Sequence, residues 1–270
     1  MKNITIFCSI ALSVLSISSF AQNPKHLTGA SDKFNNDLLS YTNSTETANE
    51  VKSTKESSSS LCNKGVQKFR QKDYLGAVEA YNKALKLEPQ NVNALFNRAN
   101  AHFALNNHKL ALIDYSSVIE LEPTDKVAYF QRGMTKMALG QYKKAIKDFT
   151  AASRLDRFFM DAYLQRGVAK LKSTDFEEAN RDFKIVIKYD PSSFVYLQKG
   201  LAEMGLGNYS QAKKDLTKSI ELDPQNAEAY FKRGVAYYDG GSRKNAVKDW
   251  EKAKSMGHEL ASKALAKYGN

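Results

Sequence analysis

The chain has 270 residues, of which 26% are charged and 42% are hydrophobic, with 14 glycines and 5 prolines. This length allows one or two domains with a buried core, and the few glycines and prolines exclude a collagen-like or wholly disordered chain. Forty basic and 29 acidic residues give a net charge of +11, a moderate excess that falls short of a polyanion-binding tail. Two cysteines exclude a disulfide framework, and four histidines leave little room for a metal cluster.

The first 21 residues have the pattern of a secretory signal peptide. Lys2 precedes an apolar run that ends at Leu15, and Ser19 and Ala21 place small residues where signal peptidase cleaves. The apolar run is short and serine-rich for a membrane span, although an uncleaved anchor is the alternative. We therefore expect export to the periplasm or the cell exterior, and the short basic start is typical of bacteria. No transmembrane span is expected after the signal is removed.

Residues 22–57 are rich in Ser, Thr, Asn, Lys and Glu. Such a segment cannot bury enough apolar surface to offset chain entropy, which predicts a flexible polar linker. Within it, Phe34, Leu38 and Tyr41 fall at helical spacing behind Ser31, so residues 31–41 are expected to form a short helix. Whether that helix docks on the rest of the chain is left open.

From residue 58 the sequence repeats a unit of about 34 residues six times. The copies span 58–91, 92–125, 126–159, 160–192, 193–226 and 227–260. Position eight of each copy is Gly or Ala, position 20 is Ala, and position 24 is large. The last of these positions holds Tyr81, Tyr115, Phe149, Phe183, Leu216 and Trp250. Small residues let two helix backbones approach closely while the large residue fills the space beside them, so each copy predicts a helical hairpin.

Residues with capping and breaking properties mark the expected helix ends. The N-caps expected for the second helices are Asp73, Asn107, Asp175, Asn208 and Ser242. Four copies close on Pro89, Pro123, Pro191 and Pro224. The third copy ends instead in Arg157-Phe158-Phe159. We expect these phenylalanines to pack under the next helix, with an exposed aromatic pair, or a hinge between 58–159 and 160–270, as alternatives.

A single hairpin cannot bury its apolar face, so stacking must supply the core, and the predicted fold is an all-α solenoid. The period, the small and aromatic positions and the closing proline resemble the tetratricopeptide repeat family. This resemblance implies a right-handed superhelix of six helix-turn-helix units whose first helices line a concave groove. The last copy is similar to the related Sel1 type. Residues 257–270 carry one apolar stripe behind Gly257 and are expected to form a C-terminal capping helix.

Opposite charges recur at two fixed positions of the repeat. Position seven is basic in every copy, and position 23 is Asp in all copies except the first, which has Ala80. In an antiparallel hairpin these positions lie at similar heights, which predicts a ladder of ion pairs. A paired arginine is poorly available to a ligand, so we interpret the ladder as architecture rather than as a basic track for an anion.

The resemblance implies that positions 2, 5, 9, 12 and 13 of the first helices face the groove. Several of these positions are apolar and would suit a hydrophobic peptide or an amphipathic helix, unless curvature buries them between adjacent first helices. A row of amides at position six could bond an extended peptide. The candidate groove residues are Phe96, Asn97, Asn100, Phe103, Phe130, Gln131, Met134, Met137, Leu164, Gln165, Leu197, Leu201, Phe231 and Tyr238.

The sequence therefore predicts an exported scaffold that binds a protein or peptide partner. One alternative is a binder of anionic envelope polymers through lysines on the convex second helices, namely Lys143, Lys144, Lys147, Lys213, Lys214, Lys244 and Lys248. Another is a spacer subunit of an envelope or secretion complex. The lysines are not interleaved with aromatic residues, so nucleic acid is not expected.

No catalytic motif is present in the sequence, and no cofactor or metal is expected. His102 is expected to pack at a repeat interface, and His108 takes a slot that aromatic residues fill in other copies. Adjacent acidic residues such as Glu177 and Glu178 point apart on a helix. Because nothing converges on a reaction centre, we do not expect an enzyme.

Overall fold

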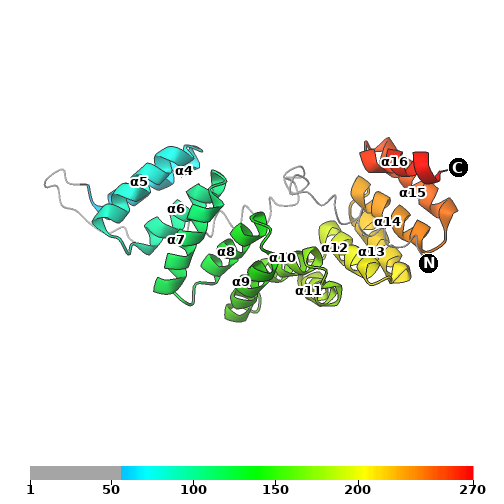
Figure 1. The fold of residues 1–270 in the computed structure, drawn as a ribbon, viewed down its shortest axis with the longest axis horizontal. Helices are drawn as coiled ribbons and strands as arrows, with labels where there is room; N and C mark the ends of the chain where they lie inside the picture. The colour runs from blue at the N-terminus through cyan, green and yellow to red at the C-terminus, as the bar shows by residue number, and fades with distance from the viewer. Residues whose placement is uncertain (1–55, 270) are drawn as a thin grey trace. The chain divides into compact units, whose positions relative to one another are not determined.

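The computed structural model describes residues 56–269, which contain thirteen helices and no strand. Successive helices pack against each other as antiparallel pairs, one pair for each repeat copy (Figure 1). The helices are α4 (Ser58–Arg70), α5 (Tyr74–Leu87), α6 (Val92–Ala104), α7 (His108–Leu121), α8 (Lys126–Ala138), α9 (Tyr142–Leu155), α10 (Met160–Lys172), α11 (Phe176–Tyr189), α12 (Ser193–Gly205), α13 (Tyr209–Leu222), α14 (Ala227–Asp239), α15 (Arg243–Ser255) and α16 (Glu259–Tyr268). The predicted all-α solenoid is confirmed.

The small and large positions of the repeat hold each hairpin together. A Cβ atom added to Gly133 would lie 2.7 Å from the ring of Phe149, and one added to Gly234 would lie 2.5 Å from the ring of Trp250. Both rings are fully buried. The glycine therefore lets the aromatic ring of the second helix lie directly against the backbone of the first, as the pattern predicts.

The second helices begin where the sequence predicts, and the five predicted N-cap residues occupy the N-cap positions, but only Asp73 makes a side-chain cap bond. Asp73 accepts a hydrogen bond from the backbone N–H of Gly76, at 2.9 Å. Asn107, Asp175, Asn208 and Ser242 occupy N-cap positions without a side-chain cap bond. Three of these four side chains bond other side chains, since Asp175 accepts from Ser173, Asn208 donates to Glu203 and Ser242 accepts from Asn245. The prediction of side-chain capping was therefore wrong at four of five positions.

The last helix, α16, covers the open end of the sixth hairpin. It follows Gly257, whose φ of +83° is favourable for glycine alone. Ala261 and Ala264 are buried against Trp250 and its neighbours, while Lys263 and Lys267 are exposed. The expected capping helix is thus confirmed.

The described residues form two compact units, 56–157 and 158–269, with three helix pairs each and α16 in the second. The junction falls at Arg157-Phe158-Phe159. Phe158 is 58% exposed and meets the ring of Tyr189 edge-on at 6.2 Å, whereas Phe159 is half-buried. The expectation that both phenylalanines pack under the next helix was wrong for Phe158.

Residues 1–55 lie outside the described residues. They include the expected signal peptide, nearly all of the expected linker and the expected helix at 31–41. Among residues 56–269, no helix combines the length and apolar character that crossing a bilayer requires.

Candidate functional site

The ion-pair ladder is present in five copies. In copy two, Arg98 Nε and Nη2 donate to the two carboxylate oxygens of Asp114 at 2.8 and 2.7 Å. The equivalent pairs are Arg132–Asp148, Arg166–Asp182, Lys199–Asp215 and Arg233–Asp249. Every aspartate is buried. These basic side chains are therefore satisfied within their own hairpins, which supports the architectural interpretation.

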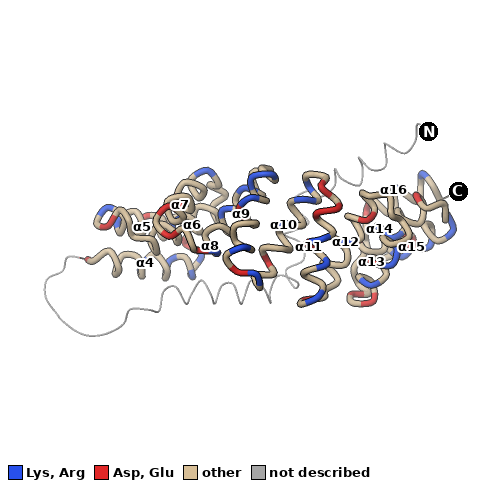
Figure 2. Tube along the Cα trace, turned by 90° about the horizontal axis from the view of Figure 1, so that it is seen from below, with Lys and Arg blue, Asp and Glu red and all other residues tan. Residues whose placement is uncertain are grey.

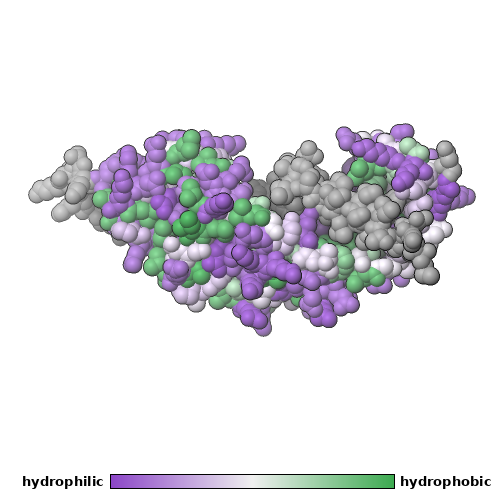
Figure 3. Space-filling model, viewed as in Figure 1, coloured by the Kyte–Doolittle hydropathy of each residue, from purple (hydrophilic) through white to green (hydrophobic). Residues whose placement is uncertain are grey.

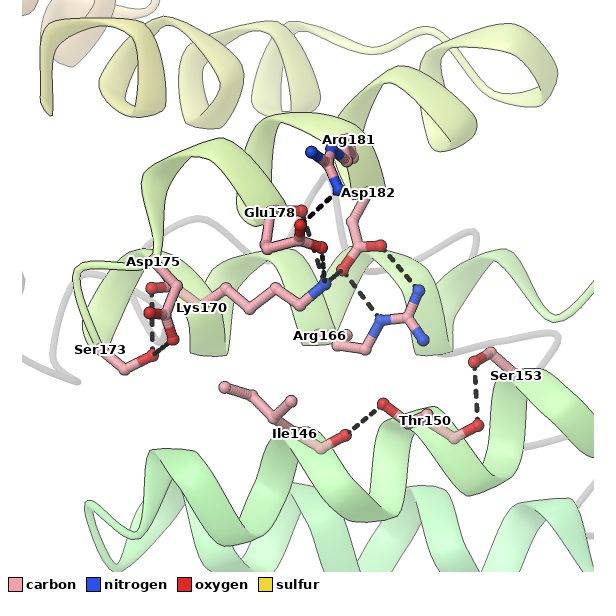
Figure 4. A network of polar contacts seen from close by, with 10 residues as sticks. All are labelled: Ile146, Thr150, Ser153, Arg166, Lys170, Ser173, Asp175, Glu178, Arg181 and Asp182. Carbon is pink, nitrogen blue, oxygen red and sulfur yellow. Dashed lines mark hydrogen bonds and ion pairs between the residues drawn. The ribbon is translucent and has the colours of Figure 1, made fainter. Parts of the chain in front are cut away.

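Two copies add a lysine to the pair. Lys170 Nζ lies 2.8 Å from Asp182 Oδ2, which also accepts from Arg166 (Figure 4). Lys136 makes the same contact with Asp148 at 2.6 Å. Both lysines stand at position 11, for which no role was predicted. A comparison of that position across the copies would have found them.

Position 11 is a histidine in copy two and a glutamate in copy five. His102 is buried, as expected. Burial lowers the pKa of His102, and this effect exceeds that of the negative charge of Asp114, which raises the pKa. Glu203 is buried and accepts from Asn180 at 2.6 Å and from Asn208 at 3.0 Å. Through Asn180 on α11, Glu203 therefore links copy five to copy four.

In the 56–157 unit, the first helices are α4, α6 and α8. Phe96 and Phe130 are buried, with ring centroids 5.7 Å from Tyr115 and 5.6 Å from Phe149. They therefore pack inside their hairpins rather than line an open surface. The half-buried candidates on these helices are Asn97, Phe103, Gln131, Met134 and Met137. On the face drawn in Figure 3, apolar surface gathers over the region of α6 to α8.

Two asparagines on α6 form a polar pair on this side of the unit. Asn97 bonds the thiol of Cys62, whose pKa is raised by burial. Asn100 Oδ1 accepts from the Tyr115 hydroxyl at 2.5 Å. Its Nδ2 is buried and has no hydrogen-bond partner among the described residues. An unsatisfied buried donor costs free energy, and because this atom is enclosed by the chain itself, the cost falls on the folded hairpin.

In the 158–269 unit, the first helices are α10, α12 and α14, and α12 contacts both of the others. Among the candidates, Leu197, Phe231 and the amide Gln165 are buried. The half-buried candidates are Leu164, Leu201 and Tyr238. Tyr238 lies against Tyr268 of α16, with centroids 4.9 Å apart. The predicted residues do share the first helices, but fewer of them are accessible than the pattern alone predicts.

A polar cluster that no sequence pattern pointed to lies where α14 meets the start of α16. His258 Nε2 lies 2.7 Å from Glu228 Oε2, and the His258 ring stacks on Phe231 at 4.5 Å. His258 Nδ1 also accepts from the backbone N–H of Ala261, which caps α16. Burial raises the pKa of Glu228, but the bond from His258 and the charge of Lys232 outweigh it and lower that pKa to about 2. The cluster joins the capping helix to the last repeat.

Within residues 56–269, no group of three or more His, Cys, Asp and Glu side chains is placed to hold a metal ion. The first helices combine half-buried apolar side chains with amides that have hydrogen-bonding capacity.

Comparison with solved structures supports the fold. The chain is similar to a tetratricopeptide repeat protein from Parabacteroides merdae, with 24% identity, a TM-score of 0.55 and coverage of 91% of this chain and 98% of that one. It is also similar to MamA from Desulfovibrio magneticus RS-1, with 20% identity, a TM-score of 0.60 and coverage of 62% and 94%. A third similar structure is YrrB, described as a TPR protein with an unusual peptide-binding site. Its identity is 22% and its TM-score is 0.61, with coverage of 70% of this chain and 99% of that one. No curated protein matches the chain.

Family sequence models match along the repeat region and together cover more than half of the chain. The model described as TPR repeat matches residues 65–106 and 200–241. A model described as tetratricopeptide repeat matches residues 92–125 and 127–159, and a second model with the same description matches residues 161–193. The likeness of the last copy to the Sel1 type stays a prediction. The chain belongs to the tetratricopeptide repeat family.

Proposed function

We propose that the protein is a scaffold that binds an extended peptide or a helix of a partner protein along the first helices of its repeats. The tetratricopeptide repeat fold supports protein–protein interaction, and members of the family are generally non-enzymatic scaffolds. The binding surface in this proposal is the side of α6 and α8 that carries Asn97, Asn100, Gln131, Met134 and Met137.

The observation that carries this proposal is that α6 and α8 each present a half-buried amide at position six, Asn97 and Gln131. An extended peptide supplies backbone carbonyl and N–H groups along its length, and such amides can bond them. Met134 and Met137 would adapt to apolar side chains of the peptide, because methionine is flexible and polarisable. The peptide-binding site described for YrrB is a property of that protein, and it makes the same class of ligand reasonable here.

The test is site-specific photo-crosslinking in cells, followed by affinity measurement. A photoreactive residue at Met134 or Met137 is expected to crosslink one and the same partner. Ile113, which is 62% exposed on the second helix α7, is the matched control position and should not crosslink it. Crosslinking of that partner from Ile113 but from neither methionine would overturn the proposed surface.

Substitution then tests the chemistry of the site. The variant N97A/Q131A is expected to weaken the binding of the identified peptide about thirtyfold, since it removes two hydrogen bonds worth about 1 kcal/mol each. Alanine at Phe96 or Phe130 is a poor probe, because both side chains are buried and their loss would destabilise the hairpin. Unchanged affinity in N97A/Q131A, with a normal helical spectrum, would contradict a role for the amides.

We also infer that the chain is exported and processed. The support is the sequence pattern of residues 1–21, with its basic start, its apolar run and its small residues before Gln22. N-terminal sequencing of the protein from fractionated cells is expected to begin at Gln22, in the periplasm or the medium. A large residue in place of Ala21 should block processing. A cytosolic protein that begins at Met1 would contradict the inference.

A further inference from the structure

The outermost side of each second helix is formed by positions 18, 22 and 26 of the repeat. These positions are spaced by four residues, so they form one stripe along the helix, on the side away from the buried residue at position 24. On α13 the stripe contains Lys214 and Lys218, opposite buried Leu216. On α15 it contains Lys244, Lys248 and Lys252, opposite buried Trp250. All five lysines are exposed, and we call them the basic outer stripe.

Little negative charge balances this stripe. The exposed residues of α13 and α15 include seven basic and two acidic side chains. Figure 2 marks the Lys and Arg positions along the trace of these helices in blue. Lys218 pairs with Glu221 at 2.9 Å, a pair that is half exposed and therefore weak. Within the described residues, no ion pair is formed by the other members, Lys214, Lys244, Lys248 and Lys252. Their charge is therefore available to a ligand.

The positive charge is not a requirement of the repeat. The same three positions include Leu75 in copy one and Ile113 in copy two, with exposed fractions of 66% and 62%. In copy four they hold Glu177, Arg181 and Ile185, and Arg181 is paired with Glu178 at 2.5 Å. Since other residues occupy these positions in folded copies of the repeat, the fold does not require the lysines of the last two copies, which fill five of six positions with Ser210 as the exception.

We propose that the basic outer stripe binds a linear acidic polysaccharide. Neighbouring lysines on one helix stand about 6 Å apart, and α13 and α15 both pack on α14, so the two stripes belong to one stack. A flexible chain with a carboxylate on successive sugars can follow both helices and release counterions from itself as it binds.

The composition of the surface selects this class of ligand over two others. Single-stranded nucleic acid needs aromatic side chains on which its bases stack, but Trp250 is fully buried and no aromatic residue of α13 or α15 is exposed. A bilayer surface favours several apolar side chains beside the lysines, whereas Leu222, one turn beyond Lys218, is the one exposed large apolar residue of α13 and α15. A polymer that offers charge and hydroxyl groups fits what remains.

This surface is separate from the one in the proposed function. The stripe lies on second helices of the 158–269 unit, whereas the proposed peptide surface lies on first helices of the 56–157 unit. The two activities can therefore fail independently, and a variant of the stripe should leave peptide binding unchanged.

The experiment measures binding of the mature protein to polygalacturonate as a function of salt. For the wild-type protein, the logarithm of the binding constant should fall linearly with the logarithm of salt concentration. In K214Q/K248Q/K252Q the slope of this plot should be shallower by about 2. Each of the three lost charges contributes about 0.7 to the slope when the ligand is a flexible strand. Affinity at low salt should fall about tenfold or more.

A matched variant separates the stripe from net charge. K184Q/K254Q/K263Q removes three exposed lysines of the same unit that lie off the stripe, so both variants lose the same charge. It should keep the wild-type slope. Equal losses in both variants, or no loss in either, would overturn the proposal. Tighter binding to phosphatidylglycerol vesicles or to a mixed-sequence single-stranded oligonucleotide, at the same salt, would overturn the choice of polysaccharide.

Discussion

At the scale of single residues, the repeat is built around a buried charge that its own hairpin neutralises. The arginine at position seven gives two parallel N–H bonds to the aspartate at position 23, a planar geometry that lysine cannot reproduce. Its third nitrogen often reaches the preceding copy, as when Arg132 Nη1 donates to Ser116 at 3.2 Å and Arg233 Nη1 to Thr217 at 3.0 Å. One side chain therefore ties two helices and two copies together.

Removal of one such aspartate should be costly. In D148A, the charges of Arg132 and Lys136 stay partly buried without their partner, since their side chains are only 19% and 16% exposed. We expect the free energy of unfolding to fall by about 3 kcal/mol, as for other broken buried pairs. Urea denaturation followed by circular dichroism measures it. The control E221Q breaks the exposed pair with Lys218 and should change stability by less than about 0.5 kcal/mol.

Glu228 should make stability depend on pH in the acid range. Its folded-state pKa of about 2 is lower than the ordinary value of 4.5, so the folded protein holds the charged form more tightly than the unfolded chain does. The resulting stabilisation is present above pH 4.5 and is lost as pH falls toward 2. The difference in unfolding free energy between wild type and E228Q should therefore shrink over that range. A difference that stays constant would contradict the role of the carboxylate.

At the scale of helices, the pairing of small and large residues decides how closely two helices approach, and terminal contacts decide where the stack ends. Without a further element after it, the sixth hairpin would expose the side of Trp250 that a seventh copy would cover. Instead α16 lays Ala261, Ala264 and Leu265 over it, and His258 caps the helix and bonds Glu228. The capping helix thus replaces a repeat with a shorter element.

Introducing a charge beneath α16 should detach it. Ala261 is fully buried, and an aspartate there would lack a partner, so A261D should release the helix from the sixth hairpin. Trp250 is the only tryptophan, and its fluorescence should shift to longer wavelength and become accessible to acrylamide. S262D places the same charge one residue further along at an exposed position and should leave the emission unchanged. An unshifted A261D spectrum would show that α16 does not shield the indole.

At the scale of the molecule, the six copies group as two sets of three, with the division between Arg157 and Phe158. This place coincides with the one repeat junction that lacks both a proline and a side-chain N-cap, since Phe159 begins α10 without a cap bond. Three repeats are about the smallest number that buries a continuous core. Each unit therefore meets the minimum for folding by itself.

Separate expression tests this division. Fragments 56–157 and 158–270 should each be helical and unfold cooperatively, at lower denaturant concentration than the intact chain, because each loses neighbours. A cut after Gly140 is the control, since it separates α8 from its partner α9 within one hairpin. Its fragments should show reduced helicity for their length. If either three-repeat fragment is unfolded, the units are not independent.

Much of this protein follows from local sequence alone. The period of 34 residues, the small residues at positions eight and 20, and the opposite charges at positions seven and 23 determine the hairpins, their order and the buried ion pairs. These predictions succeed because each depends on residues within one copy, whose spacing is set by helix geometry. The apolar stripe after Gly257 predicts the capping helix for the same reason.

Tertiary packing decided the properties that depend on which side-chain contacts form. It buried Phe96, Phe130, Leu197 and Phe231, which the pattern alone cannot distinguish from groove residues, since burial depends on how the surrounding helices close over a side chain. It exposed Phe158 and left Asn100 with a spare donor. The side chains of Asp175, Asn208 and Ser242 bond polar neighbours instead of capping, and His258 meets Glu228 from 30 residues away. Competition among several possible partners, near in sequence or far from it, is the physical reason, because helix periodicity carries no information about which partner wins.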